Sequence, residues 1–259
     1  MSEYHTAVAL IVVTDTEETA VKHMYNWMPH TFEGDAQPYY EACFTRNGKE
    51  HRVVYARQNE MGMVAAAVLA SKIISHYLPH YLIMVGLAAG IARSDVAEQI
   101  YGDVNVADLV WNYAAGKFVP TDRADIHYGN VGFIPRPTMI RMREEVRPFV
   151  EAAAASPENQ CHVHIGPMAC GTAVVANSEV LEKPVRSQLR RTVALDMESY
   201  AVVYAAENAA APRPIPLIIK SVCDYADAQK SDQYQKFAAF TSCEFAKLLY
   251  EKFLPLECP

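Results

Sequence analysis

The stretch IPLIIKSVCDYAD, residues 215–227, carries the pattern on which the fold prediction rests. A run of apolar and β-branched residues, typical of a strand, ends in small residues and two isolated acids, Asp224 and Asp227. Six further short runs have the same character. They are Ala7–Val13, Arg52–Ala56, Tyr81–Val85, Asp103–Val110, Val163–Ala169 and Thr192–Leu195.

Apolar residues at helical spacing lie between these strands. The helix candidates are residues 63–77, residues 139–150, the alanine-rich stretch Ala201–Ala211 and residues 234–249. Alternation of strands and helices predicts an α/β fold, in which helices cover both faces of a central, mixed and twisted sheet. We therefore expect a three-layer α/β architecture.

The chain shows no internal repeat, no low-complexity tract and no Gly/Ser linker. The proline-rich stretch APRPIP, residues 211–216, leads directly into an apolar strand, so we interpret it as the stop of a helix. We expect residues 1–259 to form a single domain. Residues 112–137 are rich in Gly, Pro, Asp and aromatic residues, and a loop of that length is usually functional or disordered.

Composition excludes several function classes. The 259 residues contain 23 basic and 30 acidic side chains, a formal net charge of −7, with no basic run. We therefore expect no nucleic-acid or membrane partner, because no excess of Lys and Arg is available to release counterions. No apolar run approaches the roughly 18 residues of a membrane span, no basic leader is present, and the six cysteines form no C-x-x-C pair. These features favour a cytoplasmic protein with reduced thiols.

Acids and small residues collect where the predicted strands end. In open α/β sheets, ligands bind beyond the carboxyl ends of the strands. Glu18 follows the first strand, Glu198 the sixth and Asp224 the seventh, while the glycine turn GLAAG, residues 86–90, follows the third. Their coincidence predicts a small-molecule site at this edge of the sheet.

Each of these residues also has a purely structural interpretation. Thr14 or Asp15 as helix N-cap, with Glu17 or Glu18 three residues later, matches a capping box. Glu198 suits the first turn of a helix because of the helix dipole, and Asp224 suits a solvated loop. The glycine turn lacks both the Walker-A lysine and the G-x-G-x-x-G spacing, so alone it indicates little.

Histidines and cysteines offer weaker alternatives. His162 and His164 point the same way on a strand, but no third metal ligand is evident, so a partly exposed strand face is favoured. Cys170 and Cys223 stand at strand ends, where a nucleophile is conceivable. No neighbouring cation in the sequence lowers their pKa, so small packing residues are favoured.

Motifs in matching order then identify a resemblance over nearly the whole chain. The motifs are Glu18, MGMVAAA at 61–67, VGLAAG at 85–90, GDV at 102–104, DMES at 196–199 and SVCDYAD at 221–227. The chain resembles the purine nucleoside phosphorylase and nucleosidase superfamily, most of all its methylthioadenosine/S-adenosylhomocysteine nucleosidases. The pair of DMES and SVCDYAD is the specific part of this resemblance, and it implies a nucleoside phosphorylase-like fold.

The resemblance implies a role for each site residue. Asp224 is the general acid that protonates the purine, and Glu18 orients or activates the water, with Glu17 as the alternative if the first loop aligns one residue away. The substrate-binding set is Glu198 on the ribose hydroxyls, Met197 against the sugar, Val175 at the base edge through its backbone, Ala88 and Gly90 along the sugar side, and Cys223.

The chemistry agrees with these roles. Cleavage of an N-glycosidic bond builds positive charge on the sugar while electrons flow into the base, so an acid at the base and a carboxylate near water both lower the barrier. A phosphorylase needs arginines or amides for a phosphate dianion, whereas the first loop carries Asp15, Glu17 and Glu18. Water is therefore the expected co-substrate, although Arg57 and Arg93 lie near strand ends.

The expected function is hydrolysis of an adenine-type nucleoside such as methylthioadenosine or S-adenosylhomocysteine. A phosphate-dependent phosphorylase, an AMP nucleosidase and a non-catalytic nucleoside sensor remain as alternatives. Three departures leave the substrate open: Val174 stands where related nucleosidases place an aromatic residue, Leu87 replaces a small polar residue and Lys220 replaces an arginine. The resemblance implies no cofactor or metal, and a homodimer.

Overall fold

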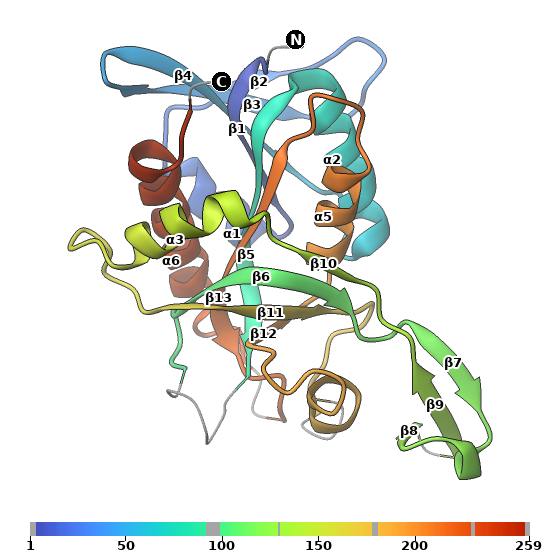
Figure 1. The fold of residues 1–259 in the computed structure, drawn as a ribbon. Coiled ribbons are helices and arrows are strands. Elements are labelled where there is room, and N and C mark those ends of the chain that lie inside the picture. The colour runs from blue at the N-terminus through green and yellow to red at the C-terminus, as the bar shows by residue number, and fades with distance from the viewer. Residues whose placement is uncertain (1–3, 92–98, 129, 178–180, 229–230, 257–259) are drawn as a thin grey trace.

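A large mixed sheet runs through the middle of the molecule, with helices on both faces (Figure 1). The computed structural model describes residues 4–91, 99–128, 130–177, 181–228 and 231–256. The strands are β1 (Thr6–Val12), β2 (Met28–His30), β3 (Tyr39–Arg46), β4 (Lys49–Arg57), β5 (Pro79–Gly90), β6 (Val104–Asn112), β7 (Gly116–Val119), β8 (Ile126–Tyr128), β9 (Val131–Pro135), β10 (Met139–Arg141), β11 (Val163–Cys170), β12 (Ala194–Asp196) and β13 (Ile215–Asp224).

Helices flank the sheet in two groups. They are α1 (Asp15–Lys22), α2 (Met63–Tyr77), α3 (Arg147–Ala154), α5 (Ser199–Glu207) and α6 (Gln235–Leu248), with 3₁₀ turns at Thr121–Arg123 and Glu144–Val146 and π-helical turns at Leu181–Arg186 and Leu249–Phe253. Side chains from α1, α3 and α6 build one core against the sheet, and side chains from α2 and α5 build the other. This arrangement is the three-layer mixed α/β architecture that the alternation predicts.

Strand β5 organises the functional edge of the sheet. Strand β13 runs parallel along one side of β5, from Tyr81 to Ala89. On the other side, β1 pairs with β5 only as far as Met84, and β12 then pairs antiparallel with Ala89 and Gly90. Between these two partners, a short length of β5 has a side without a strand neighbour, and ligands favour such switch points.

All seven predicted strands are present, as β1, β4, β5, β6, β11, β12 and β13. The predicted helices over residues 63–77 and 234–249 correspond to α2 and α6, and the alanine-rich helix is α5. The helix predicted over residues 139–150 is wrong in its first part. Residues 139–141 form β10, antiparallel to β6, and helix α3 begins only at Arg147, with a proline in its first turn.

Residues 112–137 also differ from the expectation of a long irregular loop. They contain a three-stranded sheet in the order β7-β9-β8, which projects from the body of the molecule (Figure 1). Phe118 of β7 lies opposite Phe133 of β9 in its register. Such pairs stabilise a sheet through contacts that a local sequence pattern does not reveal.

Among the described residues, no helix is both long and apolar enough to cross a membrane. The five described cysteines, Cys43, Cys161, Cys170, Cys223 and Cys243, form no disulfide, and Cys258 lies outside the described residues.

Candidate active site

A cavity opens at the switch point beside β5. Its lining comes from the ends of β1, β5, β12 and β13, from the segment after β11 and from α1 and α6. The strand register explains why distant acids meet here, because Leu195 of β12 and Asp224 of β13 both pair with Ala89 of β5. The DMES and SVCDYAD motifs therefore lie on the two sides of one strand end.

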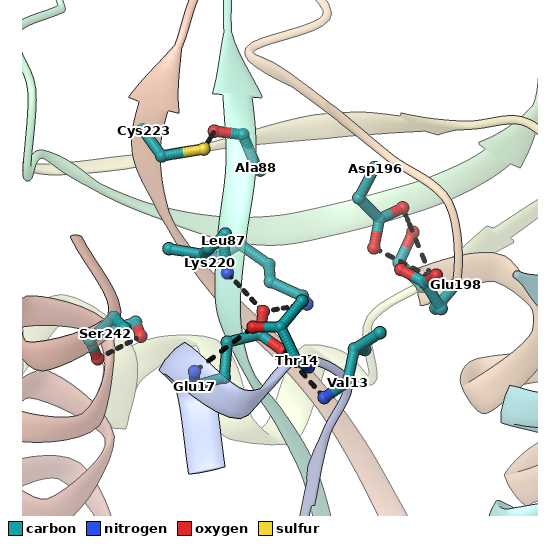
Figure 2. A network of polar contacts seen from close by, with 12 residues as sticks. Val13, Thr14, Glu17, Leu87, Ala88, Asp196, Glu198, Lys220, Cys223 and Ser242 are labelled. Carbon is teal, nitrogen blue, oxygen red and sulfur yellow. Dashed lines mark hydrogen bonds and ion pairs between the residues drawn. The ribbon is translucent and has the colours of Figure 1, made fainter. Parts of the chain in front are cut away.

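Glu17 fills the gap left beside β5 (Figure 2). Its Oε1 accepts a hydrogen bond from the Leu87 backbone N–H at 2.7 Å, and the Lys220 ammonium lies 3.3 Å from the same atom. Its Oε2 accepts from the backbone N–H groups of Val13 at 2.7 Å and Thr14 at 2.9 Å. Four donors thus converge on one carboxylate that is 1% exposed.

The capping-box interpretation of this loop is also correct. The Thr14 hydroxyl accepts from the Glu17 N–H at 3.2 Å while Glu17 accepts from the Thr14 N–H, so Thr14 is the N-cap of α1. Glu17 therefore uses one oxygen to begin the helix and presents the other to β5 and Lys220. The capping role of Glu17 is therefore compatible with its position at the cavity.

Gly86 makes the approach of Glu17 possible. Its φ is +137°, and a Cβ placed there would lie 1.8 Å from Glu17 Oε1. Any side chain at Gly86 would displace the carboxylate, because non-bonded heavy atoms do not approach so closely. The close contact with Glu17 therefore requires the first glycine of the turn.

Glu18, the residue expected to orient the water, lies outside the cavity lining. Its carboxylate pairs with Lys22 at 3.1 Å and with the Arg57 guanidinium at 3.4 Å. Consecutive residues on a helix point about 100° apart, so only one of Glu17 and Glu18 can face β5. The structure places the alternative, Glu17, at the cavity.

Asp196, the last residue of β12, and Glu198, just before α5, line the cavity. Glu198 accepts a hydrogen bond from the Gly62 backbone N–H at 2.7 Å, although it occupies the N-cap position of α5 without capping it. Burial and the neighbouring Asp196 carboxylate raise the pKa of Glu198 to about 7. Asp196 instead accepts from the Ser199 N–H at 2.9 Å and from its hydroxyl at 2.6 Å, and burial raises its pKa.

Lys220 supplies the positive charge of this group. Its side chain is 1% exposed, and its ammonium faces the carboxylates of Glu17, Asp196 and Glu198. Burial lowers the pKa of this ammonium, but the three carboxylates outweigh burial, so its pKa is raised. We call Glu17, Asp196, Glu198 and Lys220 the acid cluster.

Asp224 lines the same cavity as the acid cluster and is 3% exposed. Its Oδ1 accepts from the Ala226 backbone N–H at 2.9 Å. The Cys223 thiol also lines the cavity and lies 3.4 Å from Asp224 Oδ2 and 3.5 Å from the Ala88 carbonyl oxygen. The carboxyl group of Asp224 is therefore oriented by its own loop.

The remaining expected residues divide in two. Met197, Val175 and Ala88 line the cavity, whereas Gly90 does not. Gly90 is needed for packing instead, since a Cβ there would lie 2.8 Å from Gln99 Oε1 and 2.9 Å from a Val222 methyl group. Arg57 pairs with Asp15 and Glu18 away from the lining, and Arg93 lies outside the described residues.

The structure adds cavity residues that the sequence did not single out. Met61, Leu195 and Gln235 line it together with Val13 and Thr14. The Gly62 amide that holds Glu198 comes from the MGMVAAA motif, which the resemblance quoted without assigning it a role. For Lys220, the sequence comparison indicated only that a lysine replaces an arginine of related nucleosidases. Its position six residues after Pro214, inside an apolar strand, was the available signal, because a lysine is buried only when it is paired.

The histidine pair has a structural explanation. His164 Nε2 lies 2.8 Å from Asp103 Oδ2, so this ring is paired within the fold. In the part of the chain that the structure describes, no group of three or more His, Cys, Asp or Glu side chains could hold a metal ion.

One known family matches most of the chain. The family model of the phosphorylase superfamily matches residues 8–253. The chain belongs to the phosphorylase superfamily. Members of this superfamily include nucleoside hydrolases and phosphorylases, so the expected resemblance is confirmed at the level of the superfamily.

Two superfamily relatives are longer than this chain. The uncharacterized protein y4jS of Sinorhizobium fredii is 31% identical over 236 residues, which cover 85% of this chain and 54% of y4jS. The ATP nucleosidase Cap17 of Escherichia coli is 25% identical over 198 residues, covering 69% of this chain and 37% of Cap17. The chain spans about half of the first relative and less of the second.

Solved structures of the superfamily share the fold. The 5′-methylthioadenosine/S-adenosylhomocysteine nucleosidase of Neisseria meningitidis, in complex with methylthio-immucillin-A, has a TM-score of 0.74 at 23% identity, covering 95% of this chain and 99% of that one. Futalosine hydrolase of Helicobacter pylori has a TM-score of 0.73 at 18% identity, covering 95% and 97%. At these identities the likeness shows the fold.

Proposed function

We propose that this chain hydrolyses the N-glycosidic bond of an adenine-type purine nucleoside, releasing the free base and the ribosyl product. The observation that carries the proposal is that three buried carboxylates, Glu17, Glu198 and Asp224, line one cavity. Cleavage of this bond requires an acid at the base and a carboxylate near the water.

Each residue has a defined role in the proposed reaction. Asp224 donates its proton to the imidazole nitrogen of the purine as the bond between C1′ and the base breaks. Glu198 and Met197 hold the ribose, and Glu17, in place of Glu18, accepts a proton from the water whose oxygen bonds to C1′. The negative acid cluster also stabilises the positive charge that develops on the sugar. No step requires a cofactor.

The contacts of Glu17 favour water over phosphate. A phosphate dianion needs several convergent N–H donors or cations. Here the amides of Val13, Thr14 and Leu87 and the Lys220 ammonium already serve the Glu17 carboxylate. The side chain of Leu87 adds an apolar group to the lining. An incoming phosphate would therefore meet an occupied donor set and a fixed negative charge.

The lining also favours a substrate without a 5′-phosphate. Among the described lining residues, Lys220 is the one Lys or Arg, and carboxylates surround its ammonium. An ATP or AMP nucleosidase would need other cations near the 5′ position, so nucleotide substrates are the second candidate. The similarity to an ATP nucleosidase is the observation that favours them.

A substrate panel tests the function. Purified protein is incubated with methylthioadenosine, S-adenosylhomocysteine, adenosine, inosine, AMP and ATP, with and without phosphate, and base release is measured by chromatography. We expect phosphate-independent release of adenine from the uncharged nucleosides. Release that strictly requires phosphate indicates a phosphorylase, release from AMP or ATP alone indicates a nucleotide nucleosidase, and binding without release indicates a sensor.

An exposed apolar face supports the proposed homodimer. Val64 and Val68 on α2 are 79% and 53% exposed, and Tyr204 on the adjacent α5 is 51% exposed. Met61, at the same end of α2, is 60% exposed and lines the cavity, so a second copy on this face would border the site. Sedimentation of the wild type and of Val68→Asp tests this, with a dimer and a monomer as the expected results.

A further inference from the structure

A second cavity, of about 510 Å³, shares a wall with the active-site cavity. The shared wall is the segment 173–175, which follows β11 and lines both cavities. The rest of the second cavity is formed by Tyr113 and Ala114 after β6, by Phe118 and Phe133 of the projecting sheet and by Thr172, Ala176 and Asn177. Residues 173–175 therefore lie between the two cavities, and Val175 among them is the residue proposed to contact the edge of the purine.

Two glycines shape the aromatic wall of this second cavity. A Cβ at Gly171 would lie 2.2 Å from the ring of Tyr113, and a Cβ at Gly116 would lie 2.3 Å from the ring of Phe133. Both rings therefore lie directly against backbone where a side chain is absent. Tyr113 is 5% exposed and Phe133 is 2% exposed, so the wall is held in place before any ligand arrives.

The rim of the second cavity is apolar and open to solvent. Phe118 is 65% exposed and its ring centroid lies 5.3 Å from that of Phe133, and Val174 on the shared wall is 54% exposed. The described residues that line the cavity carry no charge. An apolar group that covers Phe118 and Val174 would remove this surface from water, which favours binding.

We propose that this cavity is a subsite for an apolar substituent on the purine base, such as an alkyl chain on its 6-amino group. The proposal rests on the proposed function, in which Val175 lies at the base edge and Asp224 at the imidazole nitrogen. The 6-amino group lies between those two positions on a purine, so a chain attached there passes Val174 and enters the second cavity. If this cavity were instead an interface for a second copy of the chain, nothing would require it to share residues 173–175 with the active-site cavity.

A series of nucleosides tests the subsite. Hydrolysis of adenosine and of its N6-methyl, N6-butyl and N6-hexyl derivatives is compared by kcat/KM. Each buried methylene favours binding about three- to fourfold, so burial of only two of the five extra methylenes makes kcat/KM for the hexyl compound exceed that for the methyl compound by about 10-fold, and burial of more gives a larger gain. A steady fall of kcat/KM with chain length, while adenosine is cleaved, would overturn the proposal.

Two variants of the projecting sheet make the test specific. Phe118→Asp places a charge in the second cavity alone, so the gain with chain length should disappear while adenosine hydrolysis is unchanged. Ile134→Asp is the matched control, because Ile134 is an exposed residue on the neighbouring strand that does not line the cavity. It should keep the full gain.

Two other outcomes separate this proposal from its alternatives. If Phe118→Asp changes the sedimentation of the protein but leaves the dependence on chain length intact, the cavity is an interface and the proposal is wrong. If no nucleoside is cleaved, the proposed function fails, and calorimetric binding of the same series then decides the subsite. A Kd that tightens with chain length in the wild type, and not in Phe118→Asp, supports it, and any other pattern overturns it.

Discussion

Asp35 and the acid cluster differ in the number of hydrogen-bond donors and cations available to each carboxylate. Asp35, before β3, is one carboxylate with four donors: the Lys72 ammonium at 2.5 Å, the Tyr39 hydroxyl at 2.7 Å, the Gln37 N–H at 3.0 Å and the His76 ring at 3.1 Å. The acid cluster has three carboxylates around the single ammonium of Lys220. The hydrogen bond from Lys72 lowers the pKa of Asp35, whereas burial raises the pKa of Glu198 to about 7.

Position and donors together separate a structural acid from a chemical one. Asp35 and Glu17 each have four donors, but Asp35 lies outside the active-site cavity and fastens two segments together, whereas Glu17 lines the cavity, where we propose that it accepts a proton from water. A buried carboxylate with few donors, such as Glu198, holds a proton near neutral pH. Substitutions at Asp35, in the acid cluster and beside it test this distinction.

The largest expected effect is on turnover, in Glu17→Ala. Loss of the group that accepts the proton of water should lower kcat by about 10²–10⁴-fold. Glu18→Ala is the matched control on the same helical turn and should stay within about threefold of wild type, since removal of a surface ion pair changes little. Equal losses in both variants, or a loss in Glu18→Ala alone, would remove Glu17 from its proposed role.

Next in size is the stability effect of Lys220→Met. Three buried carboxylates would then lack their cation, and breaking such a group costs about 3–5 kcal/mol. Lys72→Met at Asp35 is the matched control and should cost about 1 kcal/mol or less, because the Lys72 side chain is 40% exposed. Urea unfolding at pH 7 measures both, and similar losses would show that the two ammonium groups are equivalent.

A smaller effect is expected on the pH dependence of stability. The folded pKa of Glu198, about 7, exceeds the unfolded value of about 4.3, so the folded state binds the extra proton between those values. Stability from this group is therefore present below about pH 4.3 and is lost as the pH rises to 7. Glu198→Gln should be more stable than wild type at pH 8 by about 3–4 kcal/mol and nearly equal to it at pH 4.

Asp35→Asn should show the opposite sign in the same measurement. The folded pKa of Asp35 is lowered, so its contribution is present at neutral pH and is lost as the pH falls through the acid range. The variant should be less stable than wild type at pH 7, and the difference should shrink in acid. Chemical unfolding curves from pH 2 to pH 8 decide both cases, and parallel curves for Glu198→Gln and wild type would contradict the raised pKa.

The smallest effect concerns the thiol beside Asp224. If the Cys223 S–H group helps to orient the Asp224 carboxyl group, Cys223→Ala should lower kcat by about 2–10-fold, the value of one hydrogen bond. Cys223→Ser keeps a donor at this position and should recover most of the rate. Equal rates in both variants and wild type would show that the thiol only packs against Ala88.

Local patterns in the sequence were sufficient for much of the fold. Each β-branched run became a strand, and the apolar stripes over residues 63–77 and 234–249 became helices, because burial of a periodic apolar face dominates these segments. Residues 139–150 show the limit. Met139 and Ile140 have apolar side chains that suit either a helix or a strand, and pairing with β6 decided for β10. Strands β7, β8 and β9 were missed because they are only 4, 3 and 5 residues long, too short to show a clear alternating pattern.

By itself, the sequence determined that acids and small residues follow the strands and that DMES and SVCDYAD resemble motifs of the phosphorylase superfamily. It also offered a capping box, with Thr14 or Asp15 as N-cap and Glu17 or Glu18 three residues later. Only the tertiary structure decided which glutamate lines the active-site cavity. Glu17 and Glu18 are alike in type and adjacent in the chain. Only Glu17 meets the Leu87 amide, the space above Gly86 and the Lys220 ammonium, because β5 and β13, which lie 70 and 203 residues farther along the chain at these contacts, come together only in the folded sheet.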